Sequence, residues 1–453
     1  MKVFGTEIDV IYNQILALIL NVYAWFQSSF IATSNECISD EDVLQMKDPC
    51  ISIPGPGGLD RLELIEIPSS SSLSSSSFLN NEGNGGIKAT IGYNIPGMKP
   101  PFVQIPIKSS EFPPDCVLIR NQFFSVNYAD VTIRWGLYES ALRYVGWPIC
   151  PGFDFAGKVE IAGSNSGFKA GDEVFGFTLF GAYSSSILVP ARQIRKKPKI
   201  LEMSSAAAVP AVSATALHAV HLAGGWPDIP RGSNKAVLIH SAAGGVGSKL
   251  IQICKIVGFS PIIAVVGRTN KRTACLRLGA DAVINKSTED LWKRAEYYSK
   301  QGYAAIFDAN GVSTLQASYD HLSLNGKLIT YGFHSNIPMG GEFLSPIEWI
   351  KMIGRLVYMP RFDALDMVLS SKAVCGFNLS FFAQETELID LYMNQLLEWI
   401  EQGLITQEDV TIYDMKDVGK AHNFIQSGKS IGKIVLEVPS KGRTKRRTSK
   451  KNM

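Results

Sequence analysis

The sequence predicts an α/β fold in two domains: a β-rich domain, followed by a doubly wound domain whose parallel sheet carries helices on both faces. Its 453 residues exceed what one hydrophobic core usually supports. Apolar residues make up 46% of the chain and charged residues 19%, which is typical of a folded protein with a large buried core. The pattern also changes near Met203, from short β-rich runs separated by glycine to alternating helices and apolar strands.

The region before Met203 has the pattern of a compact β-rich domain. Short runs rich in β-branched and aromatic residues, bounded by glycine, predict strands. These predicted strands lie within 51–68 and at 117–120, 157–161, 172–177 and 182–189. The serine-rich run at 69–77 cannot bury apolar surface, so we expect a disordered insert over 68–86.

The region after Met203 alternates between helices and apolar strands, a succession that makes a parallel sheet with helices on both faces. We expect helices at 204–222, at 271–278, at 388–401 and from a glycine-rich turn through Val257. We expect strands from 236 into that turn and at 261–266, 282–284, 304–308, 327–331 and 431–438.

The most informative motif is the apolar strand that runs into the glycine-rich turn over 236–247. A pyrophosphate must approach bare main-chain N–H groups at a helix N-terminus, so we expect Gly244 to contact phosphate. Gly247 lies one helical turn further on, where a missing side chain lets the helix press against the strand. Ala242 replaces the first glycine of the common G-x-G-x-x-G spacing. The motif predicts a nicotinamide dinucleotide site, and the alternative is a strand, turn and helix that bind no ligand.

The residues that follow the next predicted strand indicate which coenzyme binds. An acidic residue there accepts hydrogen bonds from a free ribose 2′-hydroxyl, whereas basic residues accommodate a 2′-phosphate. The segment 267–272 contains Arg268, Lys271 and Arg272 and no acidic residue. It therefore favours NADPH over NADH, and the alternative is a solvated start of a helix.

Charge and cysteine content exclude several classes of protein. The net charge is +3, but the stretch 441–451 alone carries seven Lys and Arg residues, so the rest of the chain is mildly acidic. We therefore expect no nucleic-acid surface on the folded body. The seven cysteines are scattered without a C-x-x-C pair, which favours a reducing, cytoplasmic location and argues against a disulfide framework.

Both ends of the chain have the composition of extensions to the folded body. The segment 1–45 contains a mostly apolar stretch at 10–26, which we interpret as a membrane-facing or partner-facing helix, a helix packed on the body, or a true membrane anchor or targeting segment. The basic tail at 440–453 is predicted to be disordered. It could contact anionic lipid, act as a nuclear-import signal or serve only as a soluble tail. Peripheral membrane association is thus one of the open interpretations.

Five motifs together resemble those of the medium-chain dehydrogenase/reductase superfamily, of the quinone oxidoreductase (zeta-crystallin) type. They are Asn-Tyr-Ala-Asp at 127–130, Arg-Trp-Gly-Leu-Tyr at 134–138, Pro-Gly-Phe-Asp-Phe-Ala-Gly at 151–157, Gly-Asp-Glu-Val at 171–174 and the glycine turn at 242–247. Their order and spacing match over about residues 50–438. The segment 372–379 is similar to the vesicle amine transport protein branch.

This resemblance implies a GroES-like β-barrel catalytic domain joined to a Rossmann domain, with the active site in the cleft between them. It divides the chain into an extension at 1–45, a catalytic domain at 46–203, a Rossmann domain at 204–379, a return to the catalytic domain at 380–439 and the tail at 440–453. By analogy with the fold class, it also implies a homodimer.

The resemblance further implies catalysis without zinc. Zinc-dependent relatives carry a cysteine where this chain has Asn127 and a histidine where it has Phe153. We expect hydride transfer from NADPH to a quinone or an α,β-unsaturated carbonyl, with the Asn127 amide and the Tyr138 hydroxyl beside the oxygen that gains charge. The alternatives are a capping role for Asn127 and a packing role for Tyr138.

Coenzyme-binding residues carry over from the family by position. Gly244, Gly245, Val246 and Gly247 match the phosphate turn, while Gly267 and Lys271 match the 2′-phosphate site beside Arg268. The further matching positions are Ser213 and Thr215 on the nicotinamide side, and Asn310 and Phe333 near the nicotinamide ribose. Lys286 departs from the family, since it stands where quinone oxidoreductases often have a tyrosine near the 2′-phosphate; it either supplies another cation there or is a solvated lysine.

Two classes of function follow from the sequence. The first is an NADPH-dependent reductase of a small-molecule quinone or enone. The second is a vesicle-associated trafficking or lipid-handling protein that keeps the coenzyme fold with weak or no catalysis.

Overall fold

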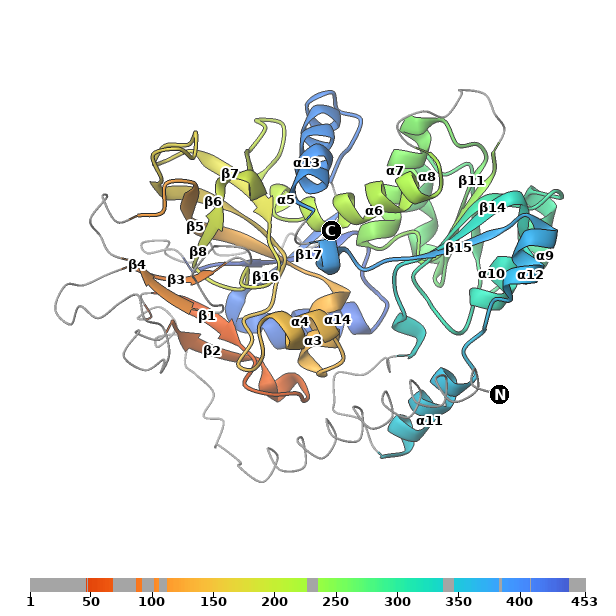
Figure 1. Cartoon of the computed structure of the whole chain (residues 1–453), viewed down its shortest axis with the longest axis horizontal. Coiled ribbons are helices and arrows are strands. Elements are labelled where there is room, and N and C mark those ends of the chain that lie inside the picture. Colours follow the sequence, from red (N-terminus) through yellow and green to blue (C-terminus); the bar gives the residue numbers. More distant parts are fainter. Residues whose placement is uncertain are drawn as a thin grey trace, which may run out of the picture.

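The computed structural model describes residues 46, 48–67, 87–91, 102–105, 112–225, 235–336, 346–382, 385–407 and 409–439. The apolar extension predicted at 1–45, the serine-rich insert at 68–86 and the basic tail at 440–453 lie outside these residues. Within them, the chain forms a β-rich unit and a parallel sheet that lie side by side, with helix α6 (Pro210–Leu222) between them (Figure 1).

The β-rich unit is built on a nine-stranded, mostly antiparallel sheet. Its main path runs in the order β4-β3-β8-β5-β6-β7-β9, and β17 joins its side by pairing with β5 while β16 pairs with β17. The strands are β3 (Ile87–Ile91), β4 (Phe102–Ile105), β5 (Cys116–Val126), β6 (Asp154–Ala162), β7 (Glu173–Phe177), β8 (Ser186–Pro190), β9 (Ile194–Lys196), β16 (Val410–Asp414) and β17 (Lys433–Glu437). A separate hairpin-like pair consists of β1 (Pro49–Ser52) and β2 (Glu63–Glu66).

The second sheet has six parallel strands in the order β12-β11-β10-β13-β14-β15. The strands are β10 (Val237–Ile239), β11 (Ile262–Val266), β12 (Ala282–Asn285), β13 (Tyr303–Asp308), β14 (Leu322–Thr330) and β15 (Ala373–Gly376). The order reverses between β10 and β13, which is the switch point where ligands of such sheets bind. The predicted doubly wound α/β fold class is thereby confirmed.

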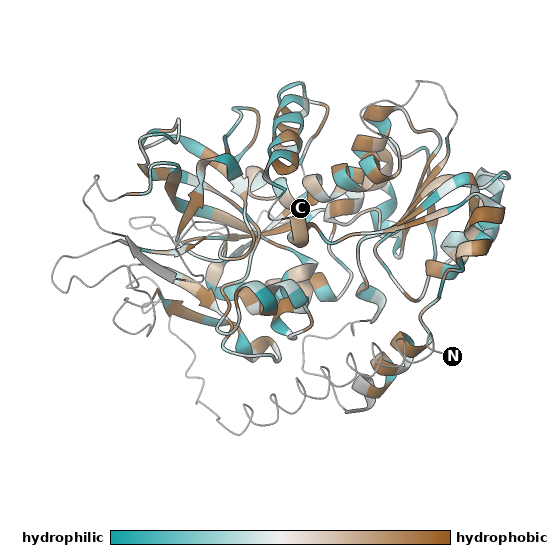
Figure 2. Cartoon of the chain, in the orientation of Figure 1, coloured by the Kyte–Doolittle hydropathy of each residue, from teal (hydrophilic) through white to brown (hydrophobic). Residues whose placement is uncertain are grey.

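Alternate residues of the parallel strands pack against helices on opposite faces. Val237 and Ile239 belong to one core with α6 and α7 (Gly245–Val257), whereas Leu238 belongs to another with α9 (Leu291–Tyr298) and α10 (Leu315–Asp320). Figure 2 shows the resulting hydrophobic colour of the central strands. Burial on both faces explains why these strands read as continuous apolar runs.

The remaining helices connect or cover these sheets. They are α3 (Tyr128–Arg134), α4 (Glu139–Tyr144), α5 (Met203–Ala206), α8 (Arg272–Leu278), α11 (Pro346–Val357), α12 (Ala364–Ser370), α13 (Thr386–Glu401) and α14 (Val418–Gln426). The single helix expected at 204–222 is wrong in one respect: it is divided into α5 and α6, and Pro210 begins α6. Proline has no N–H to continue the preceding helix, but it fits the first helical position.

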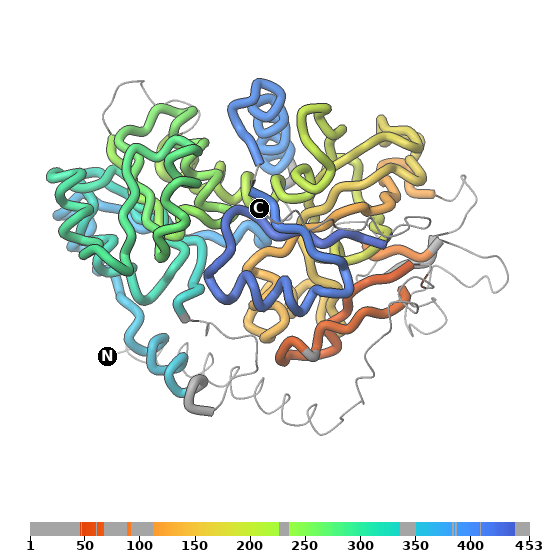
Figure 3. The backbone as a smooth tube through the Cα atoms, turned by 180° about the vertical axis from the view of Figure 1, so that it is seen from behind, coloured from red at the N-terminus to blue at the C-terminus, as the bar shows by residue number. Residues whose placement is uncertain are grey.

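The end of the chain returns to the β-rich unit. Seen from behind, the segment that contains α14 and β17 crosses the middle of the molecule and reaches the strands of the first unit (Figure 3). Helix α13 instead packs against α6, in the same core as β10 and β11. We keep the division at 46–203, 204–379 and 380–439 as a proposal.

Candidate functional site

The glycine turn lies at the switch point of the parallel sheet. His240 and Ser241 follow strand β10 and lead into the turn. Gly244 is the N-cap residue of α7. A Cβ atom on Gly247 would lie 2.6 Å from both the Ala242 Cα and the Ser241 carbonyl oxygen. Only glycine fits at this close approach of helix to strand, as the motif predicts.

The main-chain donors of the turn have distinct roles. The Gly244 N–H donates to the Ser241 carbonyl within the turn, at 2.9 Å. The N–H groups of Gly245, Val246 and Gly247 belong to the first helical turn and have no carbonyl partner within the helix. The sequence predicts the phosphate contact at Gly244. In the structure, the N–H groups available to an anion begin one residue later, at Gly245.

Basic residues gather beyond the end of β11. Lys286 lies close to Gly267, since a Cβ on that glycine would be 3.8 Å from the Lys286 Cε. Burial lowers the pKa of Lys271, and the neighbouring positive charge of Arg268 lowers it further. The Lys271 ammonium donates to the Gly428 carbonyl at 2.9 Å. The structure thus places Lys286 beside Gly267 and Lys271 near Arg268, whereas the Arg272 guanidinium donates to the Val283 carbonyl at 2.8 Å.

Strand β17 connects the glycine turn with the β-rich unit. The Gly432 N–H donates to the Ala243 carbonyl at 2.9 Å, and Gly432 forms a parallel bridge with Gly244. A Cβ atom on Gly245 would lie 2.8 Å from the Lys433 side chain. Lys433 thus lies directly against the first residue of α7.

Lys433 also enters a buried polar network with Asn127 and Asp154. The Lys433 ammonium donates to the Asn127 Oδ1 at 2.6 Å and to the Val126 carbonyl at 3.2 Å. It lies 3.6 Å from the Asp154 Oδ2. The Asn127 Nδ2 donates to the same Asp154 oxygen at 3.0 Å and approaches the Ser125 Oγ at 3.3 Å. The ammonium therefore fixes which end of the Asn127 amide faces the carboxylate.

Burial makes this network a strong constraint. The side chain of Lys433 is 3% exposed and that of Asp154 is fully buried. Burial lowers the pKa of Lys433, while the Asp154 and Asp130 carboxylates oppose this change. Asp154 also accepts a hydrogen bond from the Ala211 N–H of α6 at 2.5 Å, so it joins the β-rich unit to the helix between the sheets.

Asn127 has a second role in local structure, as the capping alternative predicts. It is the N-cap residue of α3 and forms a capping box with Asp130, whose Oδ2 accepts from the Asn127 N–H at 2.8 Å. The side chain of Asp130 is fully buried, and burial raises its pKa to about 7. The capping box thereby sets the position of the Asn127 amide.

Tyr138, the N-cap residue of α4, lies in an aromatic environment. Its ring meets Phe153 and Phe180 edge to face, with centroids 6.1 and 6.3 Å away. Its hydroxyl donates to the Asn378 Oδ1 at 3.0 Å. Burial raises the pKa of Tyr138, so the hydroxyl stays protonated at neutral pH. Across the described residues, Tyr138 and Asn127 share no hydrogen bond.

The predicted nicotinamide-side residues differ in exposure. Ser213 is buried within α6, and the Thr215 hydroxyl donates to the Ala211 carbonyl at 2.7 Å. Asn310 is 1% exposed, whereas Phe333 is 43% exposed. Asn310 follows β13 and Phe333 follows β14, at the carboxyl edge of the sheet that the glycine turn also occupies. The structure therefore brings Asn310 and Phe333 to the same edge as the turn.

Metal ligands do not gather anywhere in the described part of the chain, which holds no group of three or more His, Cys, Asp or Glu side chains placed to bind a metal ion. Phe153 is 6% exposed and packs in a small apolar core with Phe180.

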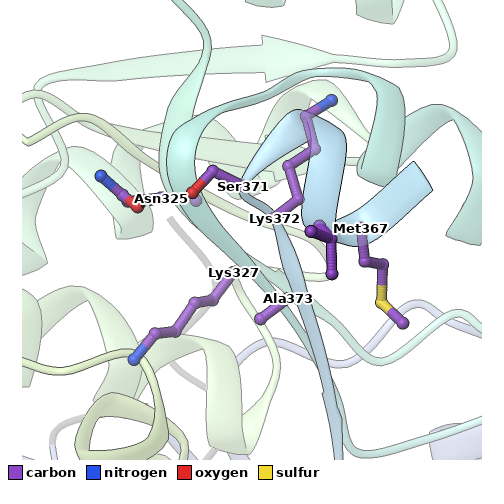
Figure 4. Close-up of a pocket in the computed structure, with 8 residues that line it drawn as sticks. Asn325, Lys327, Met367, Ser371, Lys372 and Ala373 are labelled. Atoms are coloured by element: carbon purple, nitrogen blue, oxygen red, sulfur yellow. Dashed lines mark hydrogen bonds between the residues drawn. The ribbon is translucent and has the colours of Figure 1, made fainter. Parts of the chain in front are cut away.

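A shallow pocket lies at the opposite, amino edge of β14 and β15. Figure 4 shows it lined by residues that include Asn325, Lys327 and Lys372. The Lys327 ammonium donates to the Leu222 carbonyl at 3.1 Å and the Lys372 ammonium to the Tyr319 carbonyl at 3.1 Å. Both ammonium groups thus bond to main-chain carbonyls at this edge of the sheet.

Several residues of the site were missing from the sequence prediction, chiefly Asp154 and Lys433. Asp154 stands in the 151–157 motif, and Lys433 is a charged residue at the start of an apolar strand. A charge in an otherwise buried strand is the signal that could have indicated them.

The fold and the site define a two-domain, dinucleotide-binding class of protein. Residues 113–199 match the alcohol dehydrogenase GroES-like domain family, and residues 245–391 match the zinc-binding dehydrogenase family. The chain belongs to the medium-chain dehydrogenase/reductase superfamily, in the branch of the quinone oxidoreductases and the VAT-1 proteins.

Among its relatives are synaptic vesicle membrane protein VAT-1 homologs. The Danio rerio protein is 28% identical over 71% of this chain and 63% of its own length, and the Homo sapiens protein is 28% identical over 71% and 79%. A probable quinone oxidoreductase of Schizosaccharomyces pombe is 28% identical over 71% of this chain and 89% of its own length.

Solved structures share the fold. Escherichia coli quinone oxidoreductase, solved in complex with NADPH, has a TM-score of 0.63 at 23% identity and covers 86% of this chain and 99% of its own. The human VAT-1 homolog-like protein has a TM-score of 0.63 at 21% identity and covers 87% and 99%. These matches confirm the GroES-like and Rossmann architecture.

Proposed function

We propose that this protein is an NADPH-dependent oxidoreductase that reduces a quinone or an α,β-unsaturated carbonyl without a catalytic zinc ion. The observation that carries the proposal is the glycine turn at the start of α7, together with the basic residues Arg268, Lys271 and Lys286 and the lack of an acidic residue in 267–272. Relatives named probable quinone oxidoreductase and 2-haloacrylate reductase, and a similar structure solved with NADPH, support it.

The residues present fit the coenzyme at three points. The amides of 245–247 would hold the pyrophosphate, since a helix N-terminus favours an anion. Arg268, Lys271 and Lys286 would hold the 2′-phosphate. The Asn310 amide nitrogen is buried and has no hydrogen-bond partner within the described structure, so it is suited to a coenzyme oxygen.

When bound, NADPH supplies the hydride. A carbonyl oxygen that gains negative charge on reduction needs hydrogen-bond donors. The Lys433 ammonium withdraws electron density from the Asn127 oxygen and so makes the Asn127 N–H groups stronger donors. One N–H group points to Asp154, while the other meets Ser125 only at 3.3 Å and is the one that would face substrate. Tyr138 would supply a proton after exchanging its bond to Asn378 for one to substrate.

Substitution of the usual zinc ligands supports the metal-free mechanism. Asn127 and Phe153 stand at the two ligand positions of zinc-dependent relatives, and neither side chain is a usual zinc ligand. The Asn127 amide is instead part of the Lys433 and Asp154 network.

The test is a titration of the purified protein with NADPH and NADH, followed by a turnover assay with a panel of quinones and enones. We expect tight NADPH binding, weaker NADH binding and oxidation of NADPH with at least one acceptor. Equal affinity for both coenzymes, or no binding at all, would refute the proposal.

A second candidate is a vesicle-associated or lipid-handling protein that retains coenzyme binding with weak or no catalysis. It is supported by the likeness to VAT-1 homologs and by the bonds that already engage Asn127 and Tyr138. No helix among the described residues is long and apolar enough to cross a membrane. The segments that we propose for peripheral contact are the ends at 1–45 and 440–453, on the basis of their composition. Strong NADPH binding without turnover on any acceptor would favour this candidate.

We also propose that the protein forms a homodimer. Helix α12 lies beside the edge strand β15 and exposes Leu365, Val368 and Leu369 by 66%, 75% and 77%. Exposed apolar side chains beside an open sheet edge are suited to pairing with a second copy.

A further inference from the structure

Four polar and aromatic side chains meet at the carboxyl edge of the parallel sheet, next to the glycine turn. The Ser241 hydroxyl donates to the Asn310 Oδ1 at 3.1 Å and shares a second hydrogen bond of 3.1 Å with the His334 Nε2. The His334 ring contacts the Tyr128 ring, with centroids 5.5 Å apart. Tyr128 begins α3 in the β-rich unit, so this cluster spans both units.

The protonation pattern of the cluster follows from its bonds. Serine has one hydroxyl proton, and here it points to the Asn310 oxygen. The His334 Nε2 must therefore carry a proton and donate it to the Ser241 oxygen. Burial lowers the pKa of His334 to about 4, with a further lowering by the Lys286 charge, so the imidazole is neutral at physiological pH. The hydrogen bonds therefore run in one direction: His334 donates to Ser241, and Ser241 donates to the Asn310 oxygen.

The consequence is a fixed direction for the Asn310 amide. Its side-chain oxygen accepts from the Ser241 hydroxyl, and the backbone N–H of the same residue donates to the Asp308 Oδ1 at 2.8 Å. Its Nδ2 is left without a partner in the described structure although the residue is only 1% exposed. A buried donor without a partner is costly, so its direction is best explained by a ligand acceptor.

Ser241 is itself held in an unusual conformation. Its φ is +53°, in the left-handed region that residues other than glycine rarely adopt. Backbone strain of this kind clusters where a side chain must be held for binding. In this left-handed conformation the Ser241 hydroxyl lies between Asn310 and His334 and bonds to both.

We propose that Ser241 and His334 are positioning residues that aim the Asn310 Nδ2 at an acceptor oxygen on the nicotinamide riboside half of the coenzyme. Tyr128 packs on His334 from the β-rich unit, so the aim of Asn310 depends on both units. This inference rests on the proposed coenzyme function and adds residues that control where the nicotinamide end lies.

The experiment compares two ligands that share the adenine half. NADPH contains the nicotinamide riboside, whereas 2′,5′-ADP carries only the adenosine and its phosphates. Their affinities are measured by fluorescence and calorimetric titration for wild type, Ser241→Ala, His334→Phe and His334→Gln. Ser323→Ala serves as the matched control, because it removes a hydroxyl near the opposite, amino end of β14.

We expect Ser241→Ala and His334→Phe to weaken NADPH binding about tenfold, the effect of one lost hydrogen bond, and to leave 2′,5′-ADP binding unchanged. His334→Gln should restore most of the affinity, since its amide can donate to Ser241. Ser323→Ala should bind both ligands like wild type. Asn310→Ala should lose as much NADPH affinity as Ser241→Ala. The double variant Ser241→Ala with Asn310→Ala should lose no more than either single variant, because the two residues act through one series of hydrogen bonds.

Unchanged NADPH affinity in Ser241→Ala, or an equal loss for both ligands, would overturn the positioning role while leaving coenzyme binding intact. If wild type binds neither ligand, the proposed function itself is refuted and this inference with it. Circular dichroism of each variant identifies any that fails to fold, and Asn310→Ala then provides the decisive comparison.

Discussion

Replacement of Lys433 by methionine tests whether the buried network holds the two units together. Methionine preserves the length of the side chain and removes its charge. The Asp154 carboxylate then stays buried with donors from Ser125, Asn127 and Ala211 but without a counter-charge. Breaking one partner of a buried pair costs about 3–5 kcal/mol. Because three donors remain, we expect a loss in free energy of unfolding of about 3 kcal/mol, at the lower end of that range.

The assay is urea unfolding at pH 7, monitored by intrinsic fluorescence. Lys433→Met with Asp154→Asn should recover at least half of the loss, since the double variant buries no unpaired charge. Lys420→Met is the matched control: it breaks an ion pair of 2.6 Å with Asp417, but the lysine side chain is 73% exposed. We expect little change in this control, because exposed pairs contribute little. The reasoning fails if Lys433→Met is no more destabilising than Lys420→Met.

Three further predictions concern the coenzyme, the reaction and pH. Lys271→Glu should raise the KM for NADPH at least about tenfold more than that for NADH, and equal changes would contradict the 2′-phosphate site. Asn127→Ala and Tyr138→Phe should each lower kcat about 100-fold with little change in NADPH affinity; unaltered turnover with enones in both would contradict their roles. Burial lowers the pKa of Lys249 to about 7, so the unfolded chain binds the proton more tightly and the folded state bears the full cost of the charge below that pH. The free energy of unfolding of Lys249→Met should therefore compare most favourably with that of wild type near pH 6. This difference between variant and wild type should shrink as pH rises from about 7 to about 10. A difference that stays constant with pH would show that Lys249 does not titrate in this way.

The sequence predicts best what is local. The glycine turn and the strand before it lie in one run of residues, and the need for glycine at 247 arises from contacts with Ala242, only five positions away. The parallel strands were predictable because burial on both faces requires apolar runs. The division of the helix at Pro210 was also visible in the sequence, but the alanine-rich pattern around it favoured one continuous helix.

The candidate site was less predictable because its contacts are distant in the chain. Asn127 and Lys433 are separated by 306 positions, and no pattern within either segment indicates the other. Gly244 was predicted as the phosphate contact, yet its N–H serves the turn, a detail that depends on the path of the backbone. His334 lies in a short connection after β14, where sequence patterns carry little information about side-chain contacts.

The position of β17 has a consequence for biosynthesis. Strand β5 is translated some 300 residues before the segment that covers its edge, and during that interval its main-chain groups at 123–126 await their partners. A nascent chain can complete neither the first sheet nor the contact of Gly432 with the nucleotide loop until residues 432–437 have left the ribosome. Closure of the first sheet and attachment of the nucleotide loop to it are thereby late, coupled steps in the formation of this fold.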